Sequence, residues 1–287
     1  MEHYIDDLVI REFIDQLHEL EKSSATISKY SRDVNAFRNW LGDGGLVIKS
    51  KVIEYKQALR EKYRISSANS MLSALNTFFK LLSWHECRVR TFKLQRAAFR
   101  NEQRELRAEE YQRLVEAARE KGDERLQHIM ETLAGTGIRV SELPFITVES
   151  LSTRRALVSL KGKTREVLIP LELCKKLRAY CRAKEITTGS IFVTRKGKPV
   201  DRSDILHRMK ALSGKADVSR GKIFPHNLRH LFAVTYYETE KDIVRLADLL
   251  GHVNINTTRI YTLISCDRQL SALDRVEKAL VEKVSGA

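Results

Sequence analysis

Arginine and glutamate stand three residues apart after a glycine-rich turn. Arg139 and Glu142 follow Gly135-Thr136-Gly137, and the glycines allow a tight backbone turn before a short helix. A guanidinium group is well shaped to hold two phosphate oxygens. Glu142, about one helical turn later, can orient Arg139 or a neighbouring histidine. Taken alone, such a pair is more often a surface ion pair than part of a phosphate site.

A second combination places imidazole and guanidinium groups on one helix face. Pro225 suits the first position of a helix, so His226 and Arg229 would lie one turn apart. His226 and His230 have a spacing that can bind a metal. However, the glutamate of the zinc motif HExxH is absent and no third ligand is indicated. We therefore predict a phosphate site without a metal, in which His230 is a supporting residue.

A histidine and a tyrosine follow the end of a predicted apolar helix. Gly251 is expected to terminate that helix, which leaves His252 in a loop. Asn256 or Thr257 can cap the next helix and would place Tyr261 in its opening turns. By itself, one of nine tyrosines would be a core or interface residue.

Lysines lie at the centre of a predicted β-hairpin. Residues 156–160 and 166–169 are rich in strand-forming side chains, and the segment between them contains Lys161 and Lys163. Either lysine can project into a DNA groove, although a lysine at a turn is ordinarily just solvent-exposed. We prefer Lys163, because we expect it to lie nearer the tip.

Helical periodicity dominates the first hundred residues and predicts a compact unit of four or five helices. The second half mixes helices with the hairpin. The stretch between them is rich in arginine, and we predict a linker over 88–107 that also contacts the DNA backbone. The domains are thus 1–87, 88–107 and 108–287. The predicted DNA-binding residues of the linker are Arg88, Arg90, Lys93, Arg96, Arg100 and Arg104.

The overall charge favours a polyanionic partner. The 287 residues include 51 Lys and Arg against 37 Asp and Glu, a net charge of +14. No apolar run approaches the roughly 20 residues that cross a bilayer, and the N-terminus does not resemble a secretory signal. The four cysteines form no CxxC pair, so neither a zinc site nor a disulfide framework is indicated. We expect a cytoplasmic protein that binds no membrane.

The four motifs, in this order, resemble the catalytic signature of the tyrosine recombinases, the phage-integrase and chromosome-dimer-resolvase family. The resemblance spans about residues 5–280, and its most specific part is LRH followed by LGH…TT-x-x-Y. One departure concerns the hairpin: the family often has a glycine before the lysine, whereas Leu160 precedes Lys161 here. The choice between Lys161 and Lys163 therefore stays open.

The resemblance implies a mainly α fold. It consists of an all-helical, SAM-like core-binding domain and a mixed α/β catalytic domain with a small antiparallel sheet. The implied activity is site-specific DNA recombination or integration at mobile-element, chromosome or plasmid sites, through a 3′-phosphotyrosine bond to Tyr261. Arg139 and Arg229 would hold the phosphate, His226 and His252 would assist, and a hairpin lysine would protonate the leaving oxygen. Neither a metal nor a cofactor is implied.

By the same resemblance, the partners are double-stranded DNA and three further copies of the chain, as a homotetramer on two DNA sites. An accessory directionality factor is also possible. The C-terminal segment 270–284 has apolar residues at helical spacing. In the family such a helix docks on a neighbouring subunit, and packing on its own domain is an equal alternative.

Three other functions compete with this one. A type IB topoisomerase-like enzyme would share the chemistry but relax DNA alone. A sequence-specific DNA-binding protein without chemistry would not depend on Tyr261. A metal nuclease would need a carboxylate cluster, and none of the two-metal kind is found in the sequence.

Overall fold

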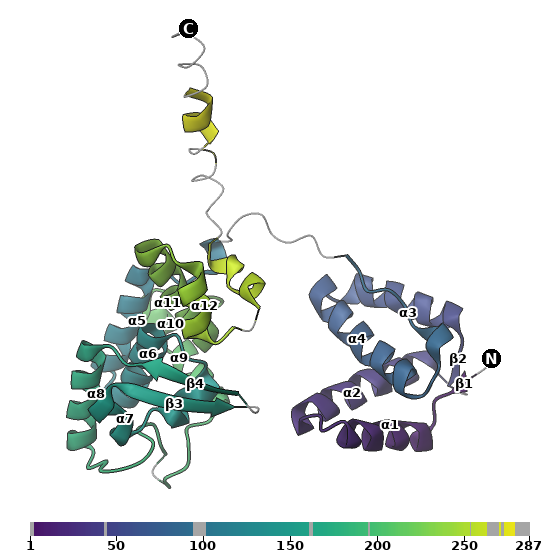
Figure 1. Cartoon of the computed structure of the whole chain (residues 1–287), viewed down its shortest axis with the longest axis horizontal. Coiled ribbons are helices and arrows are strands. Elements are labelled where there is room, and N and C mark those ends of the chain that lie inside the picture. The colour runs from purple at the N-terminus through teal and green to yellow at the C-terminus, as the bar shows by residue number, and fades with distance from the viewer. Residues whose placement is uncertain are drawn as a thin grey trace. The chain divides into compact units, whose positions relative to one another are not determined.

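The chain divides into two compact units, Met1–Arg96 and Ala97–Ala287. The division lies inside the predicted linker. The computed structural model describes residues 3–42, 45–93, 102–160, 163–194, 196–252, 254–262, 270 and 273–278. Figure 1 labels the helices and strands of both units.

The N-terminal unit is built from four helices around an apolar core. They are α1 (Asp7–Glu19), α2 (Ser24–Leu41), α3 (Lys49–Lys62) and α4 (Ile65–Leu81), followed by a single 3-10 turn, η1 (His85–Cys87). Asp6 and Ser23 cap α1 and α2 by accepting hydrogen bonds from backbone N–H groups. Two-residue strands, β1 (His3–Tyr4) and β2 (Leu46–Val47), pair antiparallel beside the predicted helices. The mainly helical prediction for this unit is confirmed.

The chain that leaves α4 is held against that helix by two asparagines. Asn76 donates to the carbonyl of Val89 and accepts from its N–H, at 2.8 and 2.9 Å. Asn69 does the same for Phe92, at 2.9 and 2.8 Å. The first part of the predicted linker is therefore attached to the N-terminal unit, with Arg88, Arg90 and Lys93 exposed.

The C-terminal unit packs helices around a small hairpin, as Figure 1 shows. Its core includes Leu114, Ile129, Leu143, Val158 and Phe192. Its helical elements are η2 (Glu102–Arg104), α5 (Ala108–Glu120), α6 (Glu124–Thr136), η3 (Val140–Phe145), α7 (Val148–Thr153), α8 (Leu171–Ala183), α9 (Arg202–Lys210), α10 (Ser213–Ala216), α11 (Pro225–Glu240), α12 (Ile243–Leu250), η4 (Ile255–Thr257) and η5 (Arg259–Tyr261). Within the described residues, no helix of either unit is long and apolar enough to cross a membrane.

The predicted β-hairpin is present as β3 (Arg155–Leu160) and β4 (Lys163–Leu168). Lys163 pairs with Leu160 at the end of the ladder, so it is not nearer the tip than Lys161. Our reason for preferring Lys163 is therefore wrong. Lys161 lies outside the described residues, and the choice between the two lysines stays a prediction.

Candidate active site

The ends of two helices converge on one buried arginine. Gly137 ends α6 and Gly251 ends α12, both with left-handed backbone, at φ +65° and +63°. Arg229, on α11, donates one hydrogen bond to the carbonyl of Gly137 (2.6 Å) and another to that of Leu250 (2.8 Å). Because carbonyl groups at a helix C-terminus carry partial negative charge, they attract a guanidinium at this point.

Arg229 is charged although it is almost completely buried. Its exposed fraction is 1%. Burial, assisted by the charge of Arg139, lowers the pKa of Arg229 to about 10, which leaves the group protonated at neutral pH. The fold therefore places a fixed positive charge in a site with little water, where it acts strongly on any developing negative charge.

His252 is held in one tautomer by its neighbours. Arg229 Nη2 lies 3.0 Å from His252 Nε2, and because arginine can only donate, Nε2 accepts. The proton of the neutral ring is therefore on Nδ1, which donates to Thr258 Oγ1 at 2.9 Å. Burial, then the charges of Arg229 and Arg139, lowers the pKa of His252 to about 4. The ring is neutral near pH 7.

Tyr261 is buried against both histidines of its neighbourhood. Its ring centroid lies 5.0 Å from that of His230, edge to face, and 6.3 Å from that of His252, nearly parallel. The side chain is 3% exposed, and burial raises the pKa of Tyr261, while the charge of Arg229 and a hydrogen bond with it act in the opposite direction. The phenol therefore stands beside the fixed guanidinium that can stabilise its anion.

Tyr261 does not lie in the helix that the sequence predicts. It ends a pair of 3-10 turns, η4 and η5, that start after Asn254. Asn254 accepts from the N–H of Asn256, and Thr258 Oγ1 bonds His252. Such local side-chain hydrogen bonds compete with a regular helix, so the chain folds into tight turns here.

Arg139 differs from Arg229 in its exposure. Its side chain is 45% exposed and donates to Glu142 at 3.0 Å, while its backbone N–H donates to the same carboxylate at 2.8 Å. Burial alone would raise the pKa of Glu142. Hydrogen bonding from Arg139 and the charges of Arg165 and Arg139 outweigh this, so the pKa is lowered and Glu142 is ionised. Arg139 is thus oriented by a buried anion and open to a ligand.

The remaining histidines lie on α11. His226 is exposed at the start of the helix, and partial desolvation followed by the charges of Arg229 and Arg139 lowers its pKa. His230 is one turn further, with Nε2 3.7 Å from an oxygen of Glu105. The structure therefore brings together Arg139, Arg229, His226, His252 and Tyr261, with His230 packed on the tyrosine.

The other predicted site residues are placed only in part. The side chains of Lys161 and Lys163 lie outside the described residues, as do Arg96 and Arg100. Arg104 is exposed, and its carbonyl accepts a hydrogen bond from Asn227 on α11 at 2.9 Å.

Two residues of the site were not predicted from the sequence. Thr258 is completely buried and holds His252. Arg165, on β4, donates to Glu142 at 2.7 Å. The sequence did contain a signal for Arg165. It lies two and four residues before the apolar Val167 and Ile169, and in an extended chain these three side chains point to the same, inward side.

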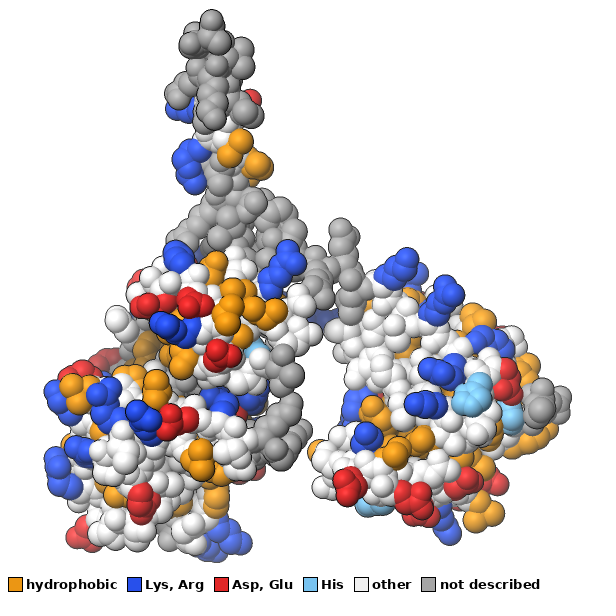
Figure 2. All heavy atoms as spheres, in the orientation of Figure 1, with side chains coloured by type: hydrophobic (Ala, Val, Ile, Leu, Met, Phe, Trp, Pro, Cys, Tyr) orange, Lys and Arg blue, Asp and Glu red, His pale blue; other side chains and the backbone are white. Residues whose placement is uncertain are grey.

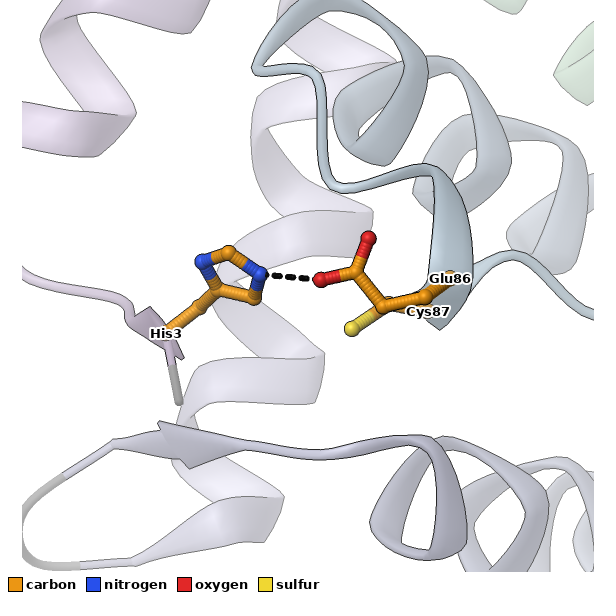
Figure 3. Close-up of side chains that lie close together, drawn as sticks. All are labelled: His3, Glu86 and Cys87. Carbon is orange, nitrogen blue, oxygen red and sulfur yellow. Dashed lines mark hydrogen bonds and ion pairs between the residues drawn. The ribbon is translucent and has the colours of Figure 1, made fainter. Parts of the chain in front are cut away.

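A cluster that could bind a metal occurs in the N-terminal unit. Among the described residues, ligand atoms of His3, Glu86 and Cys87 lie within 4.8 Å of one another (Figure 3). His3 Nε2 is 2.5 Å from Glu86, and its ring stacks on Trp84 at 4.4 Å between centroids. A structural zinc site takes four ligands. We interpret the trio as an ion pair that ties β1 to η1, with a buried thiol beside it.

Family models match most of the chain. The Phage integrase family matches residues 104–267, and the Phage integrase, N-terminal SAM-like domain matches residues 10–86. Each match lies within one of the two structural units. The match over residues 104–267 contains every candidate catalytic residue.

Curated relatives and solved structures agree with these matches. The chain is 29% identical to tyrosine recombinase XerA of Pyrococcus furiosus, covering 97% of this chain and 96% of the relative. It is also 29% identical to tyrosine recombinase XerD of Proteus mirabilis, covering 92% and 90%. A crystal structure of XerA recombinase matches with a TM-score of 0.52 at 27% identity, covering 94% and 98%. A lambda integrase dimer bound to a core site matches in fold, with a TM-score of 0.71 at 17% identity, covering 91% and 95%. With its N-terminal helices, its hairpin and its arginine–histidine–tyrosine site, this chain belongs to the phage integrase family.

Proposed function

We propose that this chain is a site-specific tyrosine recombinase, which cuts and rejoins DNA through a 3′-phosphotyrosine bond to Tyr261. The observation that carries the proposal is the position of Tyr261: a buried phenol beside the fixed charge of Arg229, with its ring in contact with those of His230 and His252. A tyrosine with a purely structural role would not need a buried cation beside its hydroxyl group.

In the proposed first step, the Tyr261 oxygen attacks the phosphorus atom of the scissile phosphodiester. One P–O bond forms to the tyrosine, and the bond to the 5′ oxygen breaks. Arg229 and Arg139 hold the nonbridging oxygens and stabilise the charge of the pentacoordinate transition state. The phosphotyrosine conserves the energy of the ester, so rejoining needs neither ATP nor a metal.

Proton transfers complete the step. The phenol loses a proton on attack, and His226, a neighbouring group with a lowered pKa, is our candidate to accept it, while His252, whose Nε2 already accepts from Arg229, contributes hydrogen bonds. The departing 5′ oxygen gains a proton, for which Lys161 or Lys163 of the hairpin is our candidate. Glu142 keeps Arg139 in place and does not touch the substrate.

The proposed substrate is double-stranded DNA, clamped by both domains. Residues 1–87 would form the core-binding domain, 88–107 the basic linker and 108–287 the catalytic domain. On the face shown in Figure 2, Lys and Arg side chains are spread over both units. The net charge of +14 and the exposed Arg88, Arg90, Lys93 and Arg104 support phosphate contacts. A DNA substrate and buried free thiols, including Cys87, Cys174 and Cys181, support a cytoplasmic location.

Assembly is part of the proposal. Solved structures with this fold include a lambda integrase tetramer bound to a Holliday junction. Residues 273–278 are helical, with Leu273 and Val276 more than half exposed. An apolar groove of about 520 Å³ lies between α5, α6 and α11, lined by Tyr111, Leu231, Phe232 and Tyr236 among others. We propose that the C-terminal helix of one subunit occupies this groove in the next, within a homotetramer on two DNA sites.

Introducing charges on the apolar face of the C-terminal helix tests this assembly. Leu273→Glu with Val276→Glu should abolish cooperative assembly on two DNA sites and leave binding of one subunit to DNA unchanged, as seen by native gel. Unchanged assembly would exclude docking between subunits. A lower melting temperature of the DNA-free monomer would instead show that the helix packs on its own domain.

The decisive experiment uses nicked suicide duplexes tiled over the DNA that flanks the gene. The duplex bound most tightly is incubated with wild type and with Tyr261→Phe in EDTA, and covalent adducts are resolved on a denaturing gel. We expect an adduct with wild type only. Tyr180→Phe, which changes another buried tyrosine, on α8, is the matched control and should form the adduct normally. Tight binding without any adduct would favour a DNA-binding protein without chemistry.

Two alternatives are tested by the same material. Cleavage without a covalent adduct, abolished by EDTA and restored by a divalent metal, would indicate a metal nuclease. A topoisomerase-like enzyme would relax supercoiled DNA but never exchange strands between two differently labelled duplexes, whereas we expect exchange.

A further inference from the structure

A charged side chain points inward from the hairpin. Arg165 lies on the same face of β4 as the buried Val167, and Ile169, which directly follows the strand, is also buried. The Arg165 side chain is 16% exposed. Arginine is rarely placed on the apolar face of a strand unless it has specific partners there.

The partners of Arg165 come from two other parts of the site. Nη2 donates to Glu142 at 2.7 Å, the same carboxylate that orients Arg139. Nη1 donates to the carbonyl of Leu249 at 2.6 Å, at the end of α12 and three residues before His252. One guanidinium therefore joins the hairpin, the Arg139 loop and the His252 loop.

Gly251 is shaped to let this side chain pass. A Cβ atom at Gly251 would lie 2.5 Å from Arg165 Cδ and 2.8 Å from its Nε. The absence of a side chain at Gly251 is thus needed twice, for its left-handed backbone and for the close approach of Arg165.

Stability alone does not explain this arrangement. The Nε atom of Arg165 is buried and finds no hydrogen-bond partner among the described residues. A buried polar atom without a partner costs free energy, and an apolar side chain at this position of β4 would avoid that cost. The arginine therefore has a task that a packed aliphatic residue would not perform.

We propose that Arg165 is a positioning residue for strand cleavage. It fixes β4, which begins at Lys163, against the two loops that carry Arg139 and His252. Arg165 thereby fixes the relative positions of three groups: the general acid of the hairpin, the arginine that holds the phosphate, and the histidine. This inference rests on the proposed recombinase function, and it names a role that Glu142 cannot fill alone, since within the described part of the chain the side-chain hydrogen bonds of Glu142 are made with Arg139 and Arg165.

The test compares Arg165→Ala and Arg165→Lys with a control on the same hairpin. Arg155 is 63% exposed on β3 and pairs with Glu166, so Arg155→Ala removes the same charge from the other face. For each variant we would measure DNA affinity, melting temperature, the final fraction of covalent adduct and its rate constant at saturating suicide duplex.

We expect Arg165→Ala to lower the rate constant by about 100-fold, the order of loss that a displacement near 1 Å causes at a reacting centre. Its DNA affinity and final adduct fraction should stay within about threefold of wild type, since the guanidinium does not bind substrate. Arg165→Lys can reach one acceptor and should recover about tenfold of that rate. Arg155→Ala should equal wild type.

The outcomes separate a positioning role from a structural one. A reduced adduct fraction with an unchanged rate constant would show that Arg165 only maintains folded protein, and would overturn the proposal. A wild-type rate for Arg165→Ala would do the same. If Arg165→Ala does not fold, a slow but fully folded Arg165→Lys supports the proposal and a fast one rejects it. If wild type itself forms no adduct, the recombinase function fails first and this role fails with it.

Discussion

The two units of this protein bury very different side chains. Among the described residues, the N-terminal unit buries one charged side chain, Asp33, within a core of aliphatic and aromatic residues. The C-terminal unit buries Glu131, Glu142 and Arg229. Because burying a charge costs free energy, a fold retains it where partners compensate and where the charge has a use. Two of these three residues, Glu142 and Arg229, lie in the candidate active site.

The difference separates two ways in which sequence becomes structure. The N-terminal unit is held by aromatic contacts such as Phe13 on Phe78, 5.1 Å apart and edge to face, which any similar apolar set can approximate. Around Tyr261, single hydrogen bonds to named carbonyl groups set the geometry. We therefore expect a conservative substitution to be tolerated in the N-terminal unit and to slow cleavage when it is made around Tyr261 in the C-terminal unit.

The largest expected effect is at the buried arginine. Arg229→Lys keeps the charge but cannot bond the carbonyls of Gly137 and Leu250 and the ring of His252 together, so we expect cleavage to slow by on the order of 10²–10³-fold. Single-turnover adduct formation measures this. Arg245→Lys, at a 72% exposed side chain on α12, is the control and should have no effect. A wild-type rate of adduct formation in Arg229→Lys would contradict the difference that we infer between the two units.

A smaller effect is expected at the buried charge of the first unit. Asp33 accepts from Lys29 at 2.5 Å, and Asp33→Asn should cost about 1.5–3 kcal/mol of stability, as loss of a bond to a charged group does. Denaturant unfolding measures it. Asp7→Asn, at an exposed ion pair with Arg38, should leave stability close to that of wild type. Neither should change the rate constant of cleavage at saturating DNA. A slower rate constant in Asp33→Asn would mean that chemistry also depends on this unit.

The smallest effect is a pH dependence. The pKa of His252 in the folded protein is about 4, below the ordinary histidine value of 6.5. The folded state disfavours protonation of this ring, so the unfolded state gains the proton first as the pH falls. The contribution of His252 to the free energy of unfolding is therefore complete above pH 6.5 and is lost as the pH falls from 6.5 toward 4. After allowance for solvent screening we expect on the order of 1 kcal/mol. Titration of the His252 ring protons by NMR, with His252→Asn to assign them, checks this. A ring that titrates near 6.5 would contradict the arrangement.

The parts of the fold that could be predicted are those with a repeating pattern. Helical spacing predicted a first unit of four or five helices, in which the structure has α1 to α4, and strand-forming runs located the hairpin, because burial of one face imposes a period on the sequence. The exact position of the hairpin turn was harder to predict from the sequence. Register placed Lys163 in β4 rather than at the tip, and a run of alternating residues does not fix where a two-residue connection lies.

The candidate site was predicted as a set of residue types but not as a network. Spacing indicated that Arg139 and Glu142 are neighbours, and their hydrogen bond is present. No spacing indicated that Arg165, 23 positions later, would share that carboxylate. Such contacts depend on how the hairpin packs on α12, which only the tertiary structure decides.

Thr258 links His252 to Tyr261 in a way that has a thermodynamic consequence. Its hydroxyl group holds His252, and its carbonyl accepts the backbone N–H of Tyr261 at 2.9 Å. The end of α12 and the two 3-10 turns thus share one anchor, and they should form a single unit of local opening, with a free energy below that of global unfolding. Hydrogen exchange would then report one opening free energy for the amides of both elements. In such an opening the positions of His252 and Tyr261 are lost together, while the rest of the C-terminal unit stays folded.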